Sequence, residues 1–308
     1  PALVDHAFFR QPDDWPHMAD RFPVVPLTML IEIMVNAAQE LAPNQCLVSV
    51  HHLRAYKWLV VEPAVDITIQ ARWASENRIR VAIEGYAECV LEVQSQWPTP
   101  PEAEAWSDPP GGKGIITKEA LYDERWMFHG PAYQGVESID SISDAGIRGT
   151  LLNIPAEGAL LDNVGQLLGY WVMIRTTVDR LAMPITVDSI RWYGPALNTD
   201  QPVECRVHIR KLSDRQVRAD MTLLVNDQVW AVLSGWTDQR FDTNERSWPV
   251  IRYPENNLLS EPIHNQIVIL EDIFNTSASQ DYYHRRYLNT PERAQYAALS
   301  DLRKGSWL

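Results

Sequence analysis

Two side chains of this 308-residue sequence are of types that can move a proton: His6, near its start, and Asp162, in its second half. An imidazole has an ordinary pKa near 6.5 and can accept a proton at neutral pH, and a carboxyl buried among apolar side chains has a raised pKa. The neighbours of Asp162 are of this apolar kind, namely Leu160, Leu161, Val164 and Leu167. Taken singly, His6 could be an ordinary surface residue. Asp162 could be an acid in the first turn of a helix, where the helix dipole stabilises a negative charge. Their sequence contexts decide between these interpretations.

Three stretches provide that context. The first is Leu3–His6, which reads Leu-Val-Asp-His and is followed by Phe22–Pro26 and Glu32. The second, Phe128–Gly135, reads Phe-His-Gly-Pro-Ala-Tyr-Gln-Gly, and the third, Leu160–Gln166, contains Asp-x-x-x-Gln with both polar residues on one helix face. Together they resemble the dehydratase domains of type I polyketide synthases and animal-type fatty acid synthases. In those domains Leu-x-Asp-His precedes a helix-opening proline, and Tyr-Gly-Pro-x-Phe-Gln and Asp-x-x-x-Gln follow in this order.

The resemblance implies a role for each matching residue. His6 is expected to be the catalytic base, Asp162 the acid, and Gln166 the residue that orients the carboxyl group. Pro26 would open the first helix, and the remaining positions would line the substrate tunnel, namely His129, Gly130, Pro131 and Tyr133.

The implied reaction is dehydration of a 3-hydroxyacyl thioester on an acyl carrier protein to a trans-2-enoyl thioester. It requires a base for the C2 proton, a neutral acid for the leaving hydroxyl, and a donor for the thioester oxygen. We expect that donor to be a backbone N–H near His129–Gly130 or a helix N-terminus. No cofactor is expected in this domain, because the substrate is carried on the phosphopantetheine arm of its carrier protein.

Two positions depart from the family pattern. The family histidine precedes the proline by nine residues, a spacing that His17 has and His6 lacks, although only His6 has the Leu-x-Asp-His context. If His6 is the base, Arg10–Arg21 is an inserted loop over the tunnel mouth. The family tyrosine before Gly-Pro is His129 here.

The elements that would position these residues occur twice. Leu27–Leu41 and Leu160–Leu181 have the apolar periodicity of long buried helices. Strand patterns follow each helix, at Val65–Trp73, Arg78–Val93, Val203–Lys211 and Arg215–Trp236. A repeated helix with an antiparallel sheet predicts an α+β fold, and the resemblance implies the double hotdog.

We expect an N-terminal hotdog at 1–97, a Pro-rich linker at 98–112, a C-terminal hotdog at 113–242 and an extension at 243–308 that leads to a further domain. The chain is interpreted as an excised piece of a longer synthase. Its last segment resembles the lead-in to a fused phosphopantetheinyl transferase, as in some iterative, enediyne-type synthases.

Composition limits the alternatives. Three widely spaced cysteines and the histidine spacing predict neither disulfides nor a metal site, and a formal charge of −13 argues against nucleic acid. No apolar run is long enough to cross a membrane, so a cytoplasmic location is expected. The expected partners are a carrier protein, the other synthase domains and, in a homodimer, a second copy. A basic cluster, namely Arg206, Arg210, Lys211, Arg215 and Arg218, is the candidate carrier-docking surface.

Other functions remain open at this stage. The same fold could be a noncatalytic acyl-binding scaffold, or a hotdog thioesterase, isomerase or cyclase.

Overall fold

A computed structural model describes residues 2–8, 18–107, 114–177, 180–242, 260–263 and 266–269. Its helices are α1 (Leu27–Leu41), α2 (Lys118–Asp123) and α3 (Ala159–Arg175), with short 3₁₀ turns η1 (Ala2–Asp5), η2 (Met18–Arg21) and η3 (Pro131–Tyr133). Its strands are β1 (Val24–Val25), β2 (Cys46–Ala55), β3 (Leu59–Val60), β4 (Ile69–Ser75), β5 (Arg78–Ile83), β6 (Ala87–Gln94), β7 (Val136–Ser143), β8 (Gly146–Leu152), β9 (Arg180–Trp192), β10 (Pro202–Leu212), β11 (Gln216–Val225), β12 (Gln228–Asp242), β13 (Ser260–Ile263) and β14 (Gln266–Ile269).

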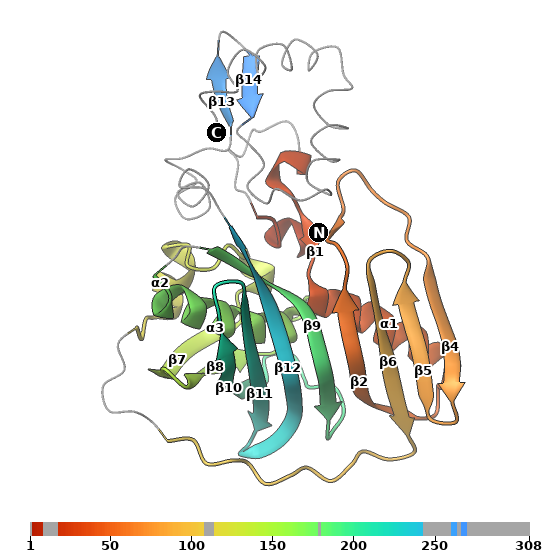
Figure 1. Cartoon of the computed structure of the whole chain (residues 1–308). Helices are drawn as coiled ribbons and strands as arrows, with labels where there is room; N and C mark the ends of the chain where they lie inside the picture. Colours follow the sequence, from red (N-terminus) through yellow and green to blue (C-terminus); the bar gives the residue numbers. More distant parts are fainter. Residues whose placement is uncertain are drawn as a thin grey trace.

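Ten of these strands form one antiparallel sheet in the order β4-β5-β6-β2-β9-β12-β11-β10-β8-β7. The first four come from the N-terminal half of the chain and the other six from the C-terminal half. The two halves join where β2 pairs with β9, in a register that places Val50 opposite Ile190. Figure 1 shows the strands side by side in front, with α1 and α3 behind them.

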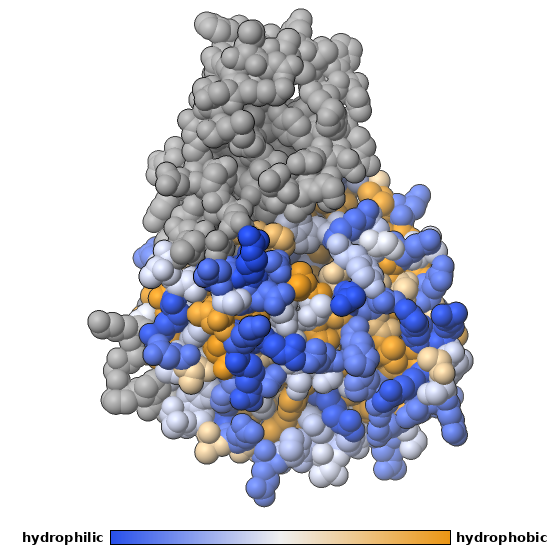
Figure 2. Space-filling view, viewed as in Figure 1, coloured by the Kyte–Doolittle hydropathy of each residue, from blue (hydrophilic) through white to orange (hydrophobic). Residues whose placement is uncertain are grey.

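Each half wraps its strands around one apolar helix. Leu30, Ile31 and Met34 of α1 are buried against the first half of the sheet, and Val164, Leu167 and Leu168 of α3 against the second. The outer face of the sheet carries many hydrophilic residues with hydrophobic ones between them (Figure 2). The predicted repeat of helix and antiparallel sheet is therefore confirmed.

The two helices approach each other closely at the start of α3. Gly158, which caps α3, has a φ of 75°, and a Cβ there would lie 2.4 Å from the backbone nitrogen of Met29 in α1. Glycine satisfies both the left-handed conformation and the close contact. This contact sets the start of α3, and hence Asp162 on its first turn, next to the start of α1.

The structure corrects several predicted boundaries. The helix predicted to end at Leu181 ends at Arg175, because β9 begins at Arg180. Arg78–Val93 is two strands separated by a turn with Gly85 at a φ of 75°, and Arg215–Trp236 is likewise divided between β11 and β12. The second turn has Asn226 and Asp227 at φ values of 50° and 63°, the conformation of a type I′ hairpin.

Beyond the two halves, less is described. Residues 98–107 contain no helix or strand, and Trp106 donates from its indole to Ser141 Oγ at 3.3 Å. The predicted domain boundaries stay predictions. In 243–308 only the hairpin of β13 and β14 is described, so most of the predicted extension toward a further domain falls outside the described residues. No helix in the described part of the chain is long and apolar enough to cross a membrane.

Candidate active site

The N-terminal segment is tied to both halves of the fold, and this fixes His6. The carbonyl of His6 accepts from Val24 N at 3.1 Å, next to an antiparallel bridge between Ala7 and Pro23. Asp5 makes the link to the second half: its carbonyl accepts from Gly130 N at 2.7 Å and its Oδ2 from Ala132 N at 2.9 Å. The Asp of Leu-x-Asp-His thus anchors the Gly-Pro turn. The sequence motif contained Asp5, but composition and spacing did not indicate this role.

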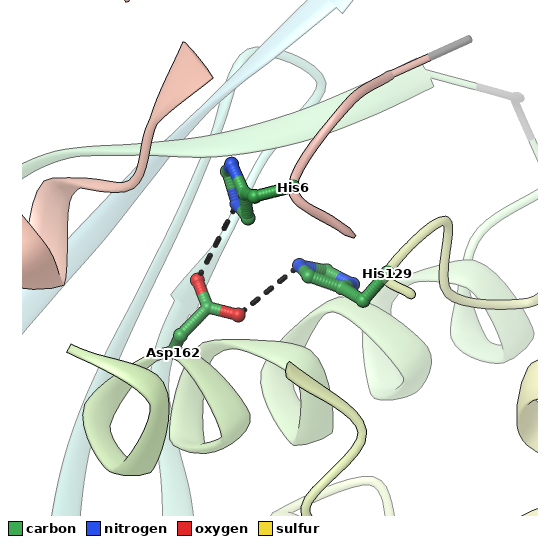
Figure 3. Close-up of side chains that lie close together, drawn as sticks. All are labelled: His6, His129 and Asp162. Carbon is green, nitrogen blue, oxygen red and sulfur yellow. Dashed lines mark ion pairs between the residues drawn. The ribbon is translucent and has the colours of Figure 1, made fainter. Parts of the chain in front are cut away.

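One nitrogen of His6 is held by the backbone and the other faces the pocket. His6 Nδ1 lies 2.9 Å from the carbonyl oxygen of Val24, which can only accept. Nδ1 therefore carries a proton, so neutral His6 has its lone pair on Nε2. Nε2 lies 3.7 Å from Asp162 Oδ1, which is beyond hydrogen-bonding distance. Figure 3 shows the two side chains pointing toward one another.

The second carboxylate oxygen of Asp162 is fully engaged. Its Oδ2 accepts from Gln166 Nε2 at 2.9 Å and lies 3.1 Å from His129 Nε2 (Figure 3). Gln166 is itself fixed, because its Oε1 accepts from the hydroxyl of Tyr122 at 2.8 Å and its Nε2 also donates to the carbonyl of Tyr133. The predicted orienting role of Gln166 fits these contacts. Tyr122 was not predicted, since no pattern around it distinguishes it from a core tyrosine.

The charge state of Asp162 differs from the expectation. Burial acts to raise the pKa of its carboxyl, but the two imidazoles that face it, His129 in hydrogen-bond contact and His6 close by, outweigh burial and hold the pKa below its ordinary value. Burial lowers the pKa of His129, and the nearby Asp162 only partly opposes this. The expectation that burial raises the pKa of Asp162 and keeps it neutral is therefore wrong, because two imidazoles face its carboxyl.

The pocket around these groups has an empty volume of about 1150 Å³, its open mouth included. His6, His129, Asp162, Gln166 and Pro26 line it, and most of the other lining residues are apolar. The remaining predicted tunnel residues do not line it, namely Gly130, Pro131 and Tyr133.

The Gly-Pro turn holds the site together but offers no free donor at Gly130. Gly130 N donates to Asp5 O, so this N–H is not free to receive the thioester oxygen. The expected donor, a backbone N–H near His129–Gly130 or a helix N-terminus, stays a prediction. A Cβ on Gly130 would lie 2.6 Å from Asp5 Oδ1, which accounts for the glycine. The ring of Tyr133 lies 5.3 Å from that of His6, and its hydroxyl donates to Glu157 O at 3.2 Å. His17, the alternative base, lies outside the described residues.

The same three side chains are near enough to hold a metal ion. One ligand atom each of His6, His129 and Asp162 lies within 4.8 Å of the others. The prediction that the site works without metal stays a prediction.

The basic cluster is largely neutralised by acids. Arg206 pairs with Glu204 at 2.5 Å, Arg210 with Asp220 at 2.7 Å, and Arg218 with Asp188. These pairs reduce its net positive charge, which weakens the case for carrier docking there.

Comparison with known proteins places this fold. No family model and no curated protein sequence matches the chain. The dehydratase domain of a mycocerosic acid synthase-like polyketide synthase is similar in structure, with a TM-score of 0.56, 19% identity, and coverage of 71% of this chain and 83% of that one. The dehydratase domain of PpsC from Mycobacterium tuberculosis, in complex with C12:1-CoA, has a TM-score of 0.55, 19% identity, and coverage of 72% and 86%. A trans-AT polyketide synthase dehydratase domain from Brevibacillus brevis has a TM-score of 0.58, 13% identity, and coverage of 78% and 90%.

This chain has the double-hotdog fold of polyketide synthase dehydratase domains. Because sequence identity is this low, the likeness establishes the fold of this double hotdog, and its chemistry has to be argued from the site.

Proposed function

We propose that this double hotdog is a polyketide synthase dehydratase domain, which removes water from a 3-hydroxyacyl thioester on an acyl carrier protein. The observation that carries the proposal is the meeting of His6 and Asp162, one from each half, with 3.7 Å between Nε2 and Oδ1 in a mostly apolar pocket. The gap leaves both atoms available to a substrate.

His6 supplies the base. With Nδ1 donating to Val24 O, the Nε2 lone pair takes the proton from C2 of the acyl chain. The C2–H electrons form the C2=C3 double bond, and the C3–O bond breaks with its electrons on oxygen. The product is a 2-enoyl thioester, and the departing oxygen needs one proton to leave as water.

Asp162 supplies a fixed negative charge beside this reaction. Its Oδ2 is occupied by Gln166 and His129, so Oδ1 is the atom that can accept from the 3-hydroxyl. The ionised carboxylate also stabilises the imidazolium that His6 becomes. The proton taken from C2 then returns from His6 Nε2 to the departing oxygen, so the reaction needs no separately protonated acid.

The decisive experiment is mass spectrometry of a 3-hydroxyacyl carrier protein incubated with the domain. Loss of one water, with a new enoyl absorbance, supports dehydration. A released free acid would point to a thioesterase, an unchanged species to an acyl-binding scaffold, and an isomer of unchanged mass to an isomerase or cyclase. Any of these three outcomes contradicts the proposal.

Variants identify the groups involved. His6→Ala and Asp162→Asn are expected to abolish water loss while keeping the fold, because neither side chain belongs to the apolar core. His51→Ala is the matched control, since His51 pairs with Glu92 at 3.1 Å and does not line the pocket. Full activity of His6→Ala, together with loss of activity in His17→Ala, would transfer the base role to His17.

A further inference from the structure

A second buried carboxyl lines the same pocket and takes no part in the proposed reaction. Asp238, on β12, is 3% exposed and lies in the pocket wall together with Trp236, Met183 and Pro184.

Only one of its oxygens has a partner among the described residues. Asp238 Oδ1 accepts from the indole Nε1 of Trp236 at 2.7 Å, and no hydrogen bond to Oδ2 is present there. Its partner across the strand pair is Pro184, which has no N–H to offer, and the register shifts between Thr237 and Asp238.

Such a group is costly unless something binds to it. Burial raises the pKa of Asp238 to about 7, against the smaller lowering effect of the Trp236 hydrogen bond. Two cationic side chains, Lys57 and Arg125, also line the pocket. A buried polar group without a full set of partners destabilises the fold, so a leucine would be the more stable occupant.

The surrounding space suits a chain that passes the carboxyl. Gly165 and Gly169 line the pocket from α3, and a Cβ on Gly165 would lie 3.3 Å from the indole Cζ2 of Trp236. Gly165 is three residues after Asp162, which is about 4.5 Å along the helix. The Trp236–Asp238 pair therefore borders the path of a substrate whose C3 lies at Asp162.

We propose that Asp238 is a polar subsite that binds a hydroxyl or amide oxygen on the flexible chain of the substrate. A hydroxyl suits either protonation state of the carboxyl, since it can donate to a carboxylate and accept from a carboxylic acid. The oxygen belongs either to the acyl chain beyond C3 or to the pantetheine arm. The proposal rests on the proposed function and specifies its substrate class.

The test compares wild type with Asp238→Leu, which removes the hydrogen bond, and Asp238→Asn, which retains one. The substrates are 3-hydroxyacyl thioesters of one length, with and without a second chain hydroxyl, each as the pantetheine and the shorter N-acetylcysteamine thioester. Wild type is expected to have a higher kcat/KM for the substrates that carry one of these features, either the second hydroxyl or the full pantetheine. In Asp238→Leu we expect this ratio of kcat/KM values to fall about 5- to 10-fold, and in Asp238→Asn we expect most of the ratio to remain.

The outcomes distinguish the acyl chain from the pantetheine arm as the source of the oxygen, and they distinguish failure of the subsite from failure of the proposed function. Loss of the preference for the hydroxylated acyl chain places the oxygen there, and loss of the preference for pantetheine places it on the arm. An equal fall for all four substrates, or no fall, overturns the subsite. If wild type dehydrates none of them, the proposed function fails. The subsite is then tested by calorimetry, using binding of the amide analogues of the same compounds to His6→Ala with and without Asp238→Leu.

Discussion

At the scale of single residues, His129 distinguishes this site, because an imidazole stands where the family pattern has a tyrosine. Its Nε2 contacts Asp162 Oδ2 at 3.1 Å, and its buried Nδ1 has no hydrogen-bond partner among the described residues. We infer that His129 is a positioning residue that holds the charge of Asp162. It acts together with Gln166, which contacts the same oxygen.

His129→Phe is expected to lower kcat about 10- to 100-fold with little change in KM, because Asp162 loses a donor and the pKa of its carboxyl rises. His129→Tyr restores a donor and should recover most of the loss. The measurement is the pH dependence of kcat for all three proteins. Equal kcat and equal profiles for wild type and His129→Phe would show that His129 does not influence the carboxylate.

Asp238 also makes stability depend on pH. Its folded-state pKa of about 7 is above the unfolded value near 3.9, so the folded protein holds a proton that the unfolded chain releases between these values. Stability should therefore fall as pH rises from 4 to 7, by at most roughly 4 kcal/mol, and level off above that. Asp238→Leu should raise the Tm most near pH 8 and least near pH 5. An advantage over wild type that is the same at both pH values would contradict this assignment.

At the scale of elements, the sequence predicted the parts that carry strong local patterns. The first helix, Leu27–Leu41, was predicted to the residue because its apolar periodicity has no internal breaker. The two hairpins were merged into long strands because the turns at Gly85 and Asn226–Asp227 are short and polar residues alternate through them. The pairing of β2 with β9 could not be predicted, since it depends on residues far apart in the chain.

The candidate site shows the same limit. His6, Asp162 and Gln166 were found through their motifs, and the structure brings them together. The ionised state of Asp162 was missed because it depends on His129, whose approach is set by tertiary packing. Asp238 was missed because a single acid in a strand pattern has no spacing to distinguish it.

The hydrogen bonds of Asp5, which join the N-terminal segment to the Gly-Pro turn, can be tested by substituting this residue. Asp5→Ala removes the acceptor for Ala132 N, so the segment that bears His6 should be less well placed. We expect a loss of about 1.5 to 3 kcal/mol in transition-state stabilisation, measured from kcat/KM, with the circular dichroism spectrum retained. Asp5→Asn keeps one oxygen and should lose less. Wild-type kinetics in Asp5→Ala would show that the bridge and backbone bonds suffice.

At the scale of the whole molecule, the halves depend on each other because β2 and β9 form one seam in a continuous sheet. Separating them would expose two strand edges and the apolar sides of both helices. We expect the fragments 1–107 and 114–242, expressed alone, to be insoluble or unfolded and without dehydratase activity. Proteins cut at a protease site placed in the linker should stay associated and active. Soluble fragments with sharp separate unfolding transitions would contradict this prediction.

The seam has a consequence for recombining double hotdogs of this kind. Each half carries one of the two side chains that meet in the pocket, His6 and Asp162, and the distance between them is set by strand pairing and by the contact of Gly158 with α1. A chimera that joined half of this chain to half of another double hotdog would combine an imidazole and a carboxylate that were never selected together. Exchange of the fold should therefore succeed when the recombination points lie outside both halves, so that the pair is inherited as one unit.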